Sequence, residues 1–184
     1  MLHYDPSQVY QPEADTCLLL DASRAEIKPG DRVLEVGTGS GYIAAGLAKL
    51  APVIATEINP HAAMCAHDAG VDVVRCNLID AIRGTFDLIL FNPPYLPTEP
   101  HERIDDWLEY ALDGGKTGRG VIERFARDAG RVLAPDGRIL LLISSLTGRK
   151  DVEVLFALQG FSAEVIRENR VEDEMLYVLR IFVR

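Results

Sequence analysis

The chain has 184 residues, enough for one sizeable core and too few for two ordinary domains, so we expect a single domain over residues 1–184. Its composition, 48% hydrophobic and 26% charged, is typical of a globular protein, and no apolar run reaches the ~20 residues of a membrane span. The net charge of −9 disfavours nucleic acid as a partner of this chain alone, because such binding depends on Lys and Arg placed against phosphates.

The N-terminus and the cysteines exclude other classes. Met1–Pro6 has no positive region followed by an apolar stretch, so it does not resemble a secretion signal, and we expect a cytoplasmic protein. Cys17, Cys65 and Cys76 are widely spaced in apolar segments and form no C-x-x-C pair. They are expected to be small core residues rather than a disulfide framework or a zinc site. The four histidines show no ligand spacing, and no metal site is expected.

Helices and strands alternate along the chain after an initial helix at about 12–26, where Ala14, Leu18, Ala22 and Ala25 repeat at helical spacing. Next come a strand at 32–36, a helix at 42–50, a strand at 52–56, a helix from the N-cap Asn59 to residue 69, and strands at 71–76 and 86–91. An amphipathic helix at 119–134, a turn at 135–137, a strand at 138–143, a helix at 149–159 and a hairpin of 161–168 with 174–183 complete the order. This alternation predicts an α/β fold with a mainly parallel sheet covered on both faces.

A glycine-rich segment follows the first strand. Gly37, Gly39 and Gly41 form a G-x-G-x-G pattern preceded by Glu35, and Tyr42 stands where a dinucleotide fingerprint needs its third glycine. Such glycines permit positive φ and let a ligand approach the backbone, although they also occur in ordinary tight turns.

The next two strands end in polar residues. Glu57 ends the second strand, where a carboxylate can accept hydrogen bonds from ribose hydroxyls, and Asn77 ends the third, where an amide can pair with an adenine edge. Either residue alone is typical of a solvated strand end. Because ligands of parallel sheets bind at the carboxyl ends of the strands, the two residues and the glycine loop together predict a nucleoside pocket.

Asn92-Pro93-Pro94-Tyr95 follows the fourth strand, and prolines there also serve simply to end a strand. An amide or aryl amine is a poor nucleophile because its lone pair is delocalised. The Asn92 side-chain oxygen and the Pro93 carbonyl can accept its N–H groups and fix it for attack on a sulfonium methyl group, while Tyr95 offers a face for stacking. The loop therefore predicts methyl transfer by positioning, without a covalent intermediate.

At this point the sequence resembles the HemK-type glutamine methyltransferases, and within them the short archaeal and eukaryotic branch that modifies translation termination factors. The segments that carry the resemblance are Val9–Pro12, Asp15–Leu20, Leu34–Gly41, Thr56–Pro60, Asn92–Tyr95 and Gly114–Arg119. The resemblance implies the class I S-adenosylmethionine-dependent methyltransferase fold, with a seven-stranded, mainly parallel sheet that has one antiparallel strand. It implies methylation of the glutamine side-chain amide in the Gly-Gly-Gln loop of a class 1 release factor.

The resemblance also implies a cofactor pocket and a partner. The pocket for S-adenosylmethionine would be lined by Thr16, Glu35, Gly37, Glu57, Asn77, Leu78 and Asn92. Relatives work with a small zinc-binding activator protein, and we expect a heterodimer of this kind. Two departures from the family pattern, Ala14 directly before Asp15 and Asn77 in place of an aspartate, concern cofactor affinity rather than the reaction.

The segment from position 98 to position 119 has six acidic residues and three basic ones. The acidic residues are Glu99, Glu102, Asp105, Asp106, Glu109 and Asp113. The segment is either a solvated surface or complementary to a basic protein surface. Trp107 and Tyr110 within it either pack the loop or stack on a substrate.

Two other functions stay open. An N6-adenine or N2-guanine methyltransferase acting on DNA or RNA would use the same Asn-Pro-Pro-Tyr loop on a flipped base, although the negative charge disfavours it. A non-catalytic subunit that binds the cofactor only for stability is disfavoured by the intact motifs.

Overall fold

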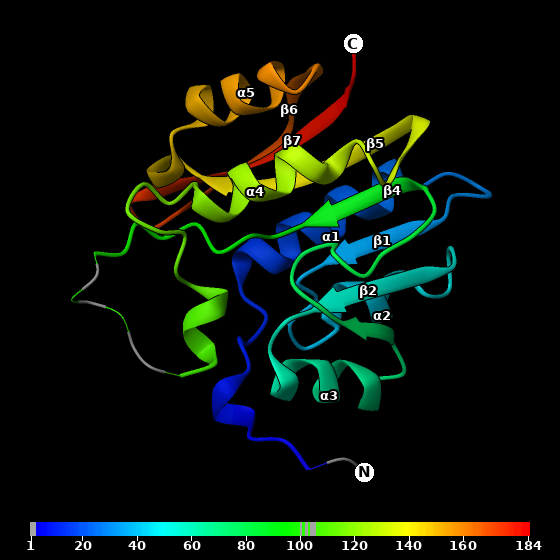
Figure 1. The fold of residues 1–184 in the computed structure, drawn as a ribbon, viewed down its shortest axis with the longest axis vertical. Helices are drawn as coiled ribbons and strands as arrows, with labels where there is room; N and C mark the ends of the chain where they lie inside the picture. The colour runs from blue at the N-terminus through cyan, green and yellow to red at the C-terminus, as the bar shows by residue number, and fades with distance from the viewer. Residues whose placement is uncertain (1–2, 100, 102, 104–105) are drawn as a thin grey trace.

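The computed structural model describes residues 3–99, 101, 103 and 106–184, which form a seven-stranded sheet (Figure 1). The strand order is β3-β2-β1-β4-β5-β7-β6, and only the β5–β7 and β6–β7 pairs are antiparallel. The strands are β1 (Val33–Val36), β2 (Val53–Glu57), β3 (Asp72–Arg75), β4 (Phe86–Phe91), β5 (Leu133–Ser144), β6 (Phe161–Val171) and β7 (Glu174–Val183). Because β7 alone runs against the others, the expected mainly parallel sheet with one antiparallel strand is confirmed.

Helices cover both faces of this sheet. Figure 1 shows α4 (Gly120–Ala129) in front of the sheet and α1 (Ala14–Glu26) behind it. One buried cluster joins α4 and α5 (Arg149–Leu158) to residues such as Leu34 and Ile89, and a second joins α1 and α2 (Tyr42–Leu47) to residues such as Val33 and Leu88. Since successive strand residues point to opposite faces, the apolar strands fill both layers. The remaining elements are α3 (Pro60–Asp68) and the short 3-10 turns η1 (Pro6–Gln8), η2 (Leu108–Ala111) and η3 (Ser145–Thr147).

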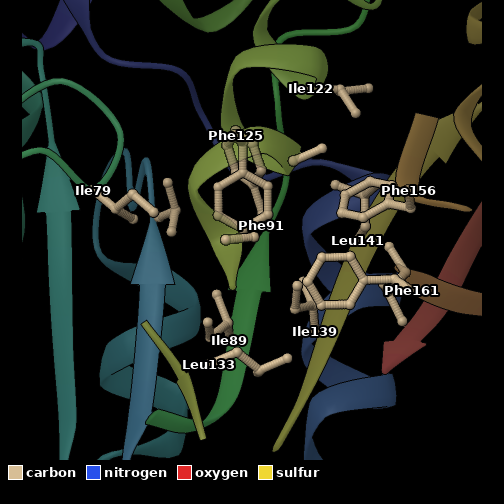
Figure 2. Packing of buried hydrophobic residues seen from close by; sticks show 14 of the residues in the cluster. Ile79, Ile89, Phe91, Ile122, Phe125, Leu133, Ile139, Leu141, Phe156 and Phe161 are labelled. Carbon is tan, nitrogen blue, oxygen red and sulfur yellow. The ribbon is translucent and has the colours of Figure 1, made fainter. Parts of the chain in front are cut away.

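The last residue of β4 is fixed by aromatic packing. Figure 2 shows Phe91 beside Phe125 of α4, and their ring centroids lie 4.9 Å apart in an edge-to-face arrangement. Phe125 in turn contacts Phe156 of α5. Both rings of the first pair are almost fully buried. This packing holds the end of β4 in place immediately before Asn92.

The apolar face expected for α1 was only partly correct, because Ala22 is buried and Leu18 packs against the core, but the two end residues differ. Ala25 is exposed and Ala14 is only half-buried, whereas Asp15 and Thr16 are buried. These two polar residues line the cavity described below, so the first turn of this helix is buried for a reason other than hydrophobicity. Cys17, one position further, is exposed on the opposite side.

The expectation that the cysteines are core residues was also wrong, because Cys65 and Cys76 are only half-buried. Cys65 lies on α3 next to the buried side of that helix, which is formed by Ala62, Ala63 and Ala66. Cys76 follows the last residue of β3 and lies at the rim of the cavity.

The helix expected at 119–134 is shorter in the structure. It ends at Ala129 because the chain turns at Gly130 and returns to the sheet, where Leu133 pairs with Phe86. The turn expected at 135–137 lies inside β5, where the register with β4 shifts between Phe86 and Leu88. Leu133 continues the apolar repeat of the helix, and this concealed the start of the strand.

Candidate active site

A cavity of about 890 Å³ opens at the carboxyl ends of β1, β2, β3 and β4. Its size falls within the range of small-molecule sites, roughly 300–1,000 Å³. Among the predicted site residues, those that line it are Thr16, Glu35, Gly37, Gly39, Glu57, Asn77, Leu78, Asn92, Pro93, Pro94 and Tyr95. Residues far apart in the sequence therefore meet at the carboxyl ends of the strands, as expected for a ligand site of a parallel sheet.

Glu35 supports the glycine loop from below. It is buried, and one of its carboxylate oxygens accepts hydrogen bonds from Thr38 Oγ1 at 2.6 Å and from the Ala44 backbone N–H at 2.9 Å. Burial raises the pKa of Glu35 to about 8. The glycine loop adopts positive φ at Gly37 and Gly39, and a Cβ added at Gly39 would meet nothing within 4 Å. The loop is therefore held in shape and open on its outer side.

Gly41 has a different position from the other two glycines. A Cβ there would lie 3.0 Å from Cα of Ala66 and 3.1 Å from Val71, with φ at +82°. Gly41 is not among the described residues that line the cavity. The structure thus gives Gly41 a packing role between α2 and α3, and contact with the cofactor stays a prediction.

Glu57 connects the glycine loop to the start of α3. One carboxylate oxygen accepts the Gly39 N–H at 2.8 Å, and the other accepts the N–H groups of Ile58 and Asn59 at 2.9 Å each. Burial raises the pKa of Glu57 as well. A carboxylate has about four acceptor positions, so these three bonds leave about one for a ribose hydroxyl.

The rim beside β3 is formed by Asn77 and Leu78. Asn77 is exposed at the cavity and Leu78 adopts a φ of +46°, which is unusual for a branched side chain. Together with Glu57 and the glycine loop, this half of the cavity offers an amide, an apolar side chain, a carboxylate and a backbone without Cβ atoms. This donor and acceptor set fits the adenosyl part of S-adenosylmethionine.

Asn92 carries the most informative polar atom of the site. Its Nδ2 donates to Oδ2 of Asp15 at 3.0 Å, and its Oδ1 is buried without a hydrogen-bond partner among the described residues. Because a carboxylate only accepts, the NH₂ group must face Asp15, and this determines which way the amide points. A buried acceptor without a partner costs about 1–3 kcal/mol, so a ligand N–H at this position would be favoured.

Asp15 organises the surrounding hydroxyl groups. Besides Asn92, the phenols of Tyr10 and Tyr95 donate to the same Oδ2 atom at 3.2 and 3.5 Å. Thr16 donates its N–H and its hydroxyl to Oδ1. Burial, followed by the negative charge of Asp15, raises the pKa of both phenols, which keeps them protonated as donors.

The acidic segment before α4 is only partly free. Asp106, Glu109 and Asp113 all line the cavity, and the last two lie 4.0 and 3.1 Å from Arg103. Glu102 and Asp105 lie outside the described residues. Asp106 accepts the Glu109 N–H at 3.0 Å, which orders the start of η2.

The two aromatic residues of this segment contact each other. The rings of Trp107 and Tyr110 stack with their centroids 5.2 Å apart, and the backbone N–H of Trp107 donates to Oε1 of Gln8. Trp107 therefore packs the loop against the N-terminal segment, while Tyr110 is exposed at the cavity.

Sequence reasoning missed several lining residues. Asp15 was recognised only as part of a family segment, although a buried acidic residue in the first turn of an apolar helix is an unusual feature. Tyr10, Arg124 and Glu174 also line the cavity. Glu174 comes from the start of β7, where its carboxylate accepts a hydrogen bond from Ser144, and no local pattern indicates this.

Metal-binding clusters and membrane-spanning helices are both absent from the described residues. No group of three or more His, Cys, Asp or Glu side chains within residues 3–99, 101, 103 and 106–184 could hold a metal ion. In the same part of the chain, no helix is long and apolar enough to cross a membrane.

Comparisons with known proteins agree with this geometry. The model of the methyltransferase small domain family matches residues 11–105. A protein of Methanocaldococcus jannaschii named putative protein N5-glutamine methyltransferase is 37% identical over 180 residues, which cover 94% of this chain and 90% of that protein. The human protein named methyltransferase HEMK2 is 33% identical, with 95% of this chain and 89% of the relative covered.

Among solved structures, a chain of the E. cuniculi Mtq2–Trm112 complex, described as responsible for methylation of the eRF1 translation termination factor, superposes with a TM-score of 0.82. It is 30% identical, and the match covers 96% of this chain and 99% of that one. The fold, the cavity and these matches agree. The chain therefore belongs to the methyltransferase small domain family and is an S-adenosylmethionine-dependent N-methyltransferase of the HemK type.

Proposed function

We propose that this chain methylates the side-chain amide nitrogen of a glutamine in a class 1 translation release factor. The observation that carries the proposal is the buried Oδ1 atom of Asn92, which has no hydrogen-bond partner among the described residues and belongs to a residue that lines a cavity fitting S-adenosylmethionine. A primary amide has two N–H groups in one plane, and Asn92 Oδ1 can accept one of them. The names of the relatives from M. jannaschii and E. cuniculi support a glutamine amide and a termination factor as substrate.

The chain's own residues would act by positioning. When bound, S-adenosylmethionine supplies a methyl group made electrophilic by the sulfonium. Asn92 Oδ1 and the Pro93 carbonyl would accept the two amide N–H groups, which increases electron density on the nitrogen and directs its lone pair. Asp15 already accepts hydrogen bonds from Asn92, Tyr10 and Tyr95, so it holds the amide acceptor rather than removing a proton.

We propose that the glycine loop, Glu57, Asn77 and Leu78 hold the adenosyl part of the cofactor. Thr16 and Glu35 would support the pocket, Thr16 at its wall and Glu35 beneath the loop. Gly39 leaves space beside the Glu57 carboxylate, because no Cβ occupies it.

We also propose that residues 1–184 act as one domain in the cytoplasm, where translation terminates, together with a small zinc-binding activator protein. A two-protein complex is described for the E. cuniculi structure. In this chain β3 is an edge strand, and Val74 on it is exposed. Edge strands offer unpaired N–H and C=O groups to a second chain, which makes β3 a suitable contact for the activator.

The nucleic-acid alternative is less well supported. Eight acidic residues and two basic residues are found among the described residues that line the cavity. Most affinity for DNA or RNA comes from cations placed against phosphates, and this lining would repel a phosphate backbone. A basic protein loop is the better match.

Transfer of a radiolabelled methyl group from S-adenosylmethionine tests the proposal. The acceptors are a purified release factor, the same factor with its Gly-Gly-Gln glutamine changed to alanine, and DNA and RNA oligonucleotides, each with and without the activator. We expect label only in the unchanged factor. Label in the oligonucleotides but not in the factor would favour the alternative, and no label in any acceptor with the activator present would reject the proposal.

A further inference from the structure

Gly118 lies directly against the backbone of the Asn-Pro-Pro-Tyr loop. Its φ is +68°, and a Cβ at this position would collide with the carbonyl oxygen of Tyr95 and lie 3.3 Å from its carbonyl carbon. Real Cβ atoms do not approach a backbone oxygen this closely. A side chain at position 118 would therefore have to displace Tyr95 or the turn that contains Gly118.

Backbone hydrogen bonds join the same two segments. The Leu96 N–H donates to Leu112 O at 3.2 Å, the Gly114 N–H donates to Leu96 O at 2.9 Å, and Leu96 pairs with Asp113 in a parallel bridge. We call residues 112–118 the brace. They pair with the chain that immediately follows the catalytic loop.

The brace is closed on itself and attached to the domain. The Gly118 N–H donates to Gly115 O at 2.9 Å, and the Gly120 N–H donates to Gly114 O at 2.8 Å, where α4 begins. The guanidinium of Arg119, the residue between Gly118 and Gly120, donates to the Thr147 carbonyl oxygen at 2.5 Å and forms an ion pair with Asp151 of α5 at 3.2 Å. These contacts connect the brace to the helices on one face of the sheet.

We propose that the brace sets the position of the catalytic loop and that Gly118 is a positioning residue for methyl transfer, acting through the backbone of Tyr95. The inference rests on the proposed function, because it assigns Gly118 a part in that reaction. Tyr95 is three residues from Asn92, and both side chains meet Asp15, so a displaced Tyr95 carbonyl would move the acceptor geometry. A displacement of about 1 Å at a reacting group costs on the order of 10²-fold in rate.

Gly118→Ala tests this inference, with Gly70→Ala as the matched control. Gly70 has a φ of +84° and a Cβ there would meet nothing within 4 Å, so alanine adds similar backbone strain without a collision. We expect kcat to fall by at least about tenfold in Gly118→Ala, with the KM for the cofactor little changed, and to stay at the wild-type level in Gly70→Ala. A wild-type kcat in Gly118→Ala would overturn the inference.

A second readout does not depend on methyl transfer. The side-chain amide signals of Asn92 in nitrogen-15 NMR spectra report its contact with Asp15, and we expect them to move in Gly118→Ala and not in Gly70→Ala. If the wild-type chain does not methylate the release factor, the proposed function fails, but these signals still test the brace. Unmoved signals in Gly118→Ala would overturn the inference.

A second variant covers the case in which Gly118→Ala does not fold. Arg119→Gln removes the ion pair with Asp151 and loosens the attachment of the brace. We expect a smaller fall in kcat and smaller shifts of the Asn92 signals. Wild-type values for both would overturn the inference.

Discussion

The Asp15 carboxylate accepts a hydrogen bond from Nδ2 of Asn92 at 3.0 Å, across 77 positions of sequence. This contact determines the direction of the Asn92 amide, because its oxygen must then point away from the carboxylate. The oxygen is buried and has no partner among the described residues. The first turn of α1 thus prepares the acceptor at the end of β4 before any substrate binds.

Asp15→Ala should uncouple this acceptor from the fold. Without the carboxylate, Asn92, Tyr10 and Tyr95 lose a shared acceptor, and the Asn92 amide can turn. We expect kcat to fall on the order of 10²-fold, because misplaced reacting groups cost about that much. Affinity for S-adenosylhomocysteine, measured by calorimetry, should change little. Asp21→Ala, which removes an exposed carboxylate from the same helix, is the control, and an equal loss in both variants would contradict this role.

Glu57→Gln should weaken cofactor binding. A glutamine has a single acceptor oxygen, so at least one backbone N–H beside the glycine loop would face an NH₂ group. Losing the charge-assisted hydrogen bond proposed between Glu57 and a ribose hydroxyl, worth about 1.5–3 kcal/mol, corresponds to roughly tenfold or more in affinity. Calorimetric titration with S-adenosylhomocysteine measures this. The control Asp72→Asn removes an exposed charge from β3, and an unchanged affinity in Glu57→Gln would reject the assignment.

Glu35 should make the protein less stable as the pH rises. Burial raises the pKa of Glu35 from 4.5 to about 8, so the folded chain keeps a proton that the unfolded chain releases. The stabilisation of the folded chain by this bound proton is fully present below about pH 4.5, and it is lost as the pH rises toward 8. Glu35→Gln stays neutral and should flatten this slope in urea titrations at several pH values. Equal slopes in the two proteins would show that Glu35 is ionised in the fold.

Asp106→Lys should slow methylation of a basic protein substrate. Asp106 lines the cavity, and its charge favours a cationic loop. We expect a higher KM for the release factor, with a difference that shrinks as salt is added. Asp106→Asn is the control, because it keeps a side-chain oxygen for the Glu109 N–H. The acidic segment would be only a solvated surface if the lysine variant had an unchanged KM.

The element order was predictable because the strands are short apolar runs and each helix has its own local signals. Asn59, for example, accepts hydrogen bonds from the N–H groups of His61 and Ala62, as an N-cap before a proline should. The glycine loop and the Asn-Pro-Pro-Tyr loop were recognisable for the same reason, since each is a continuous segment at a strand end.

Contacts between distant segments were not predictable in this way. The bond from Asn92 to Asp15, the position of Glu174 at the cavity and the approach of Gly118 to Tyr95 all depend on how the layers pack. The part of the apolar face of α1 that was predicted wrongly has the same origin. Asp15 and Thr16 are buried because they face the site, and a hydrophobic repeat carries no information about that.

The most direct test of the central claim is the rate of methyl transfer to the release factor by Asn92→Ala, measured in a single turnover with the cofactor in excess. Removing the acceptor oxygen should abolish transfer, whereas affinity for S-adenosylhomocysteine should weaken only modestly. Transfer at a near-normal rate by this variant would contradict the account, because the oxygen that Asn92 holds without a partner, on the side of its amide away from Asp15, would then not be needed.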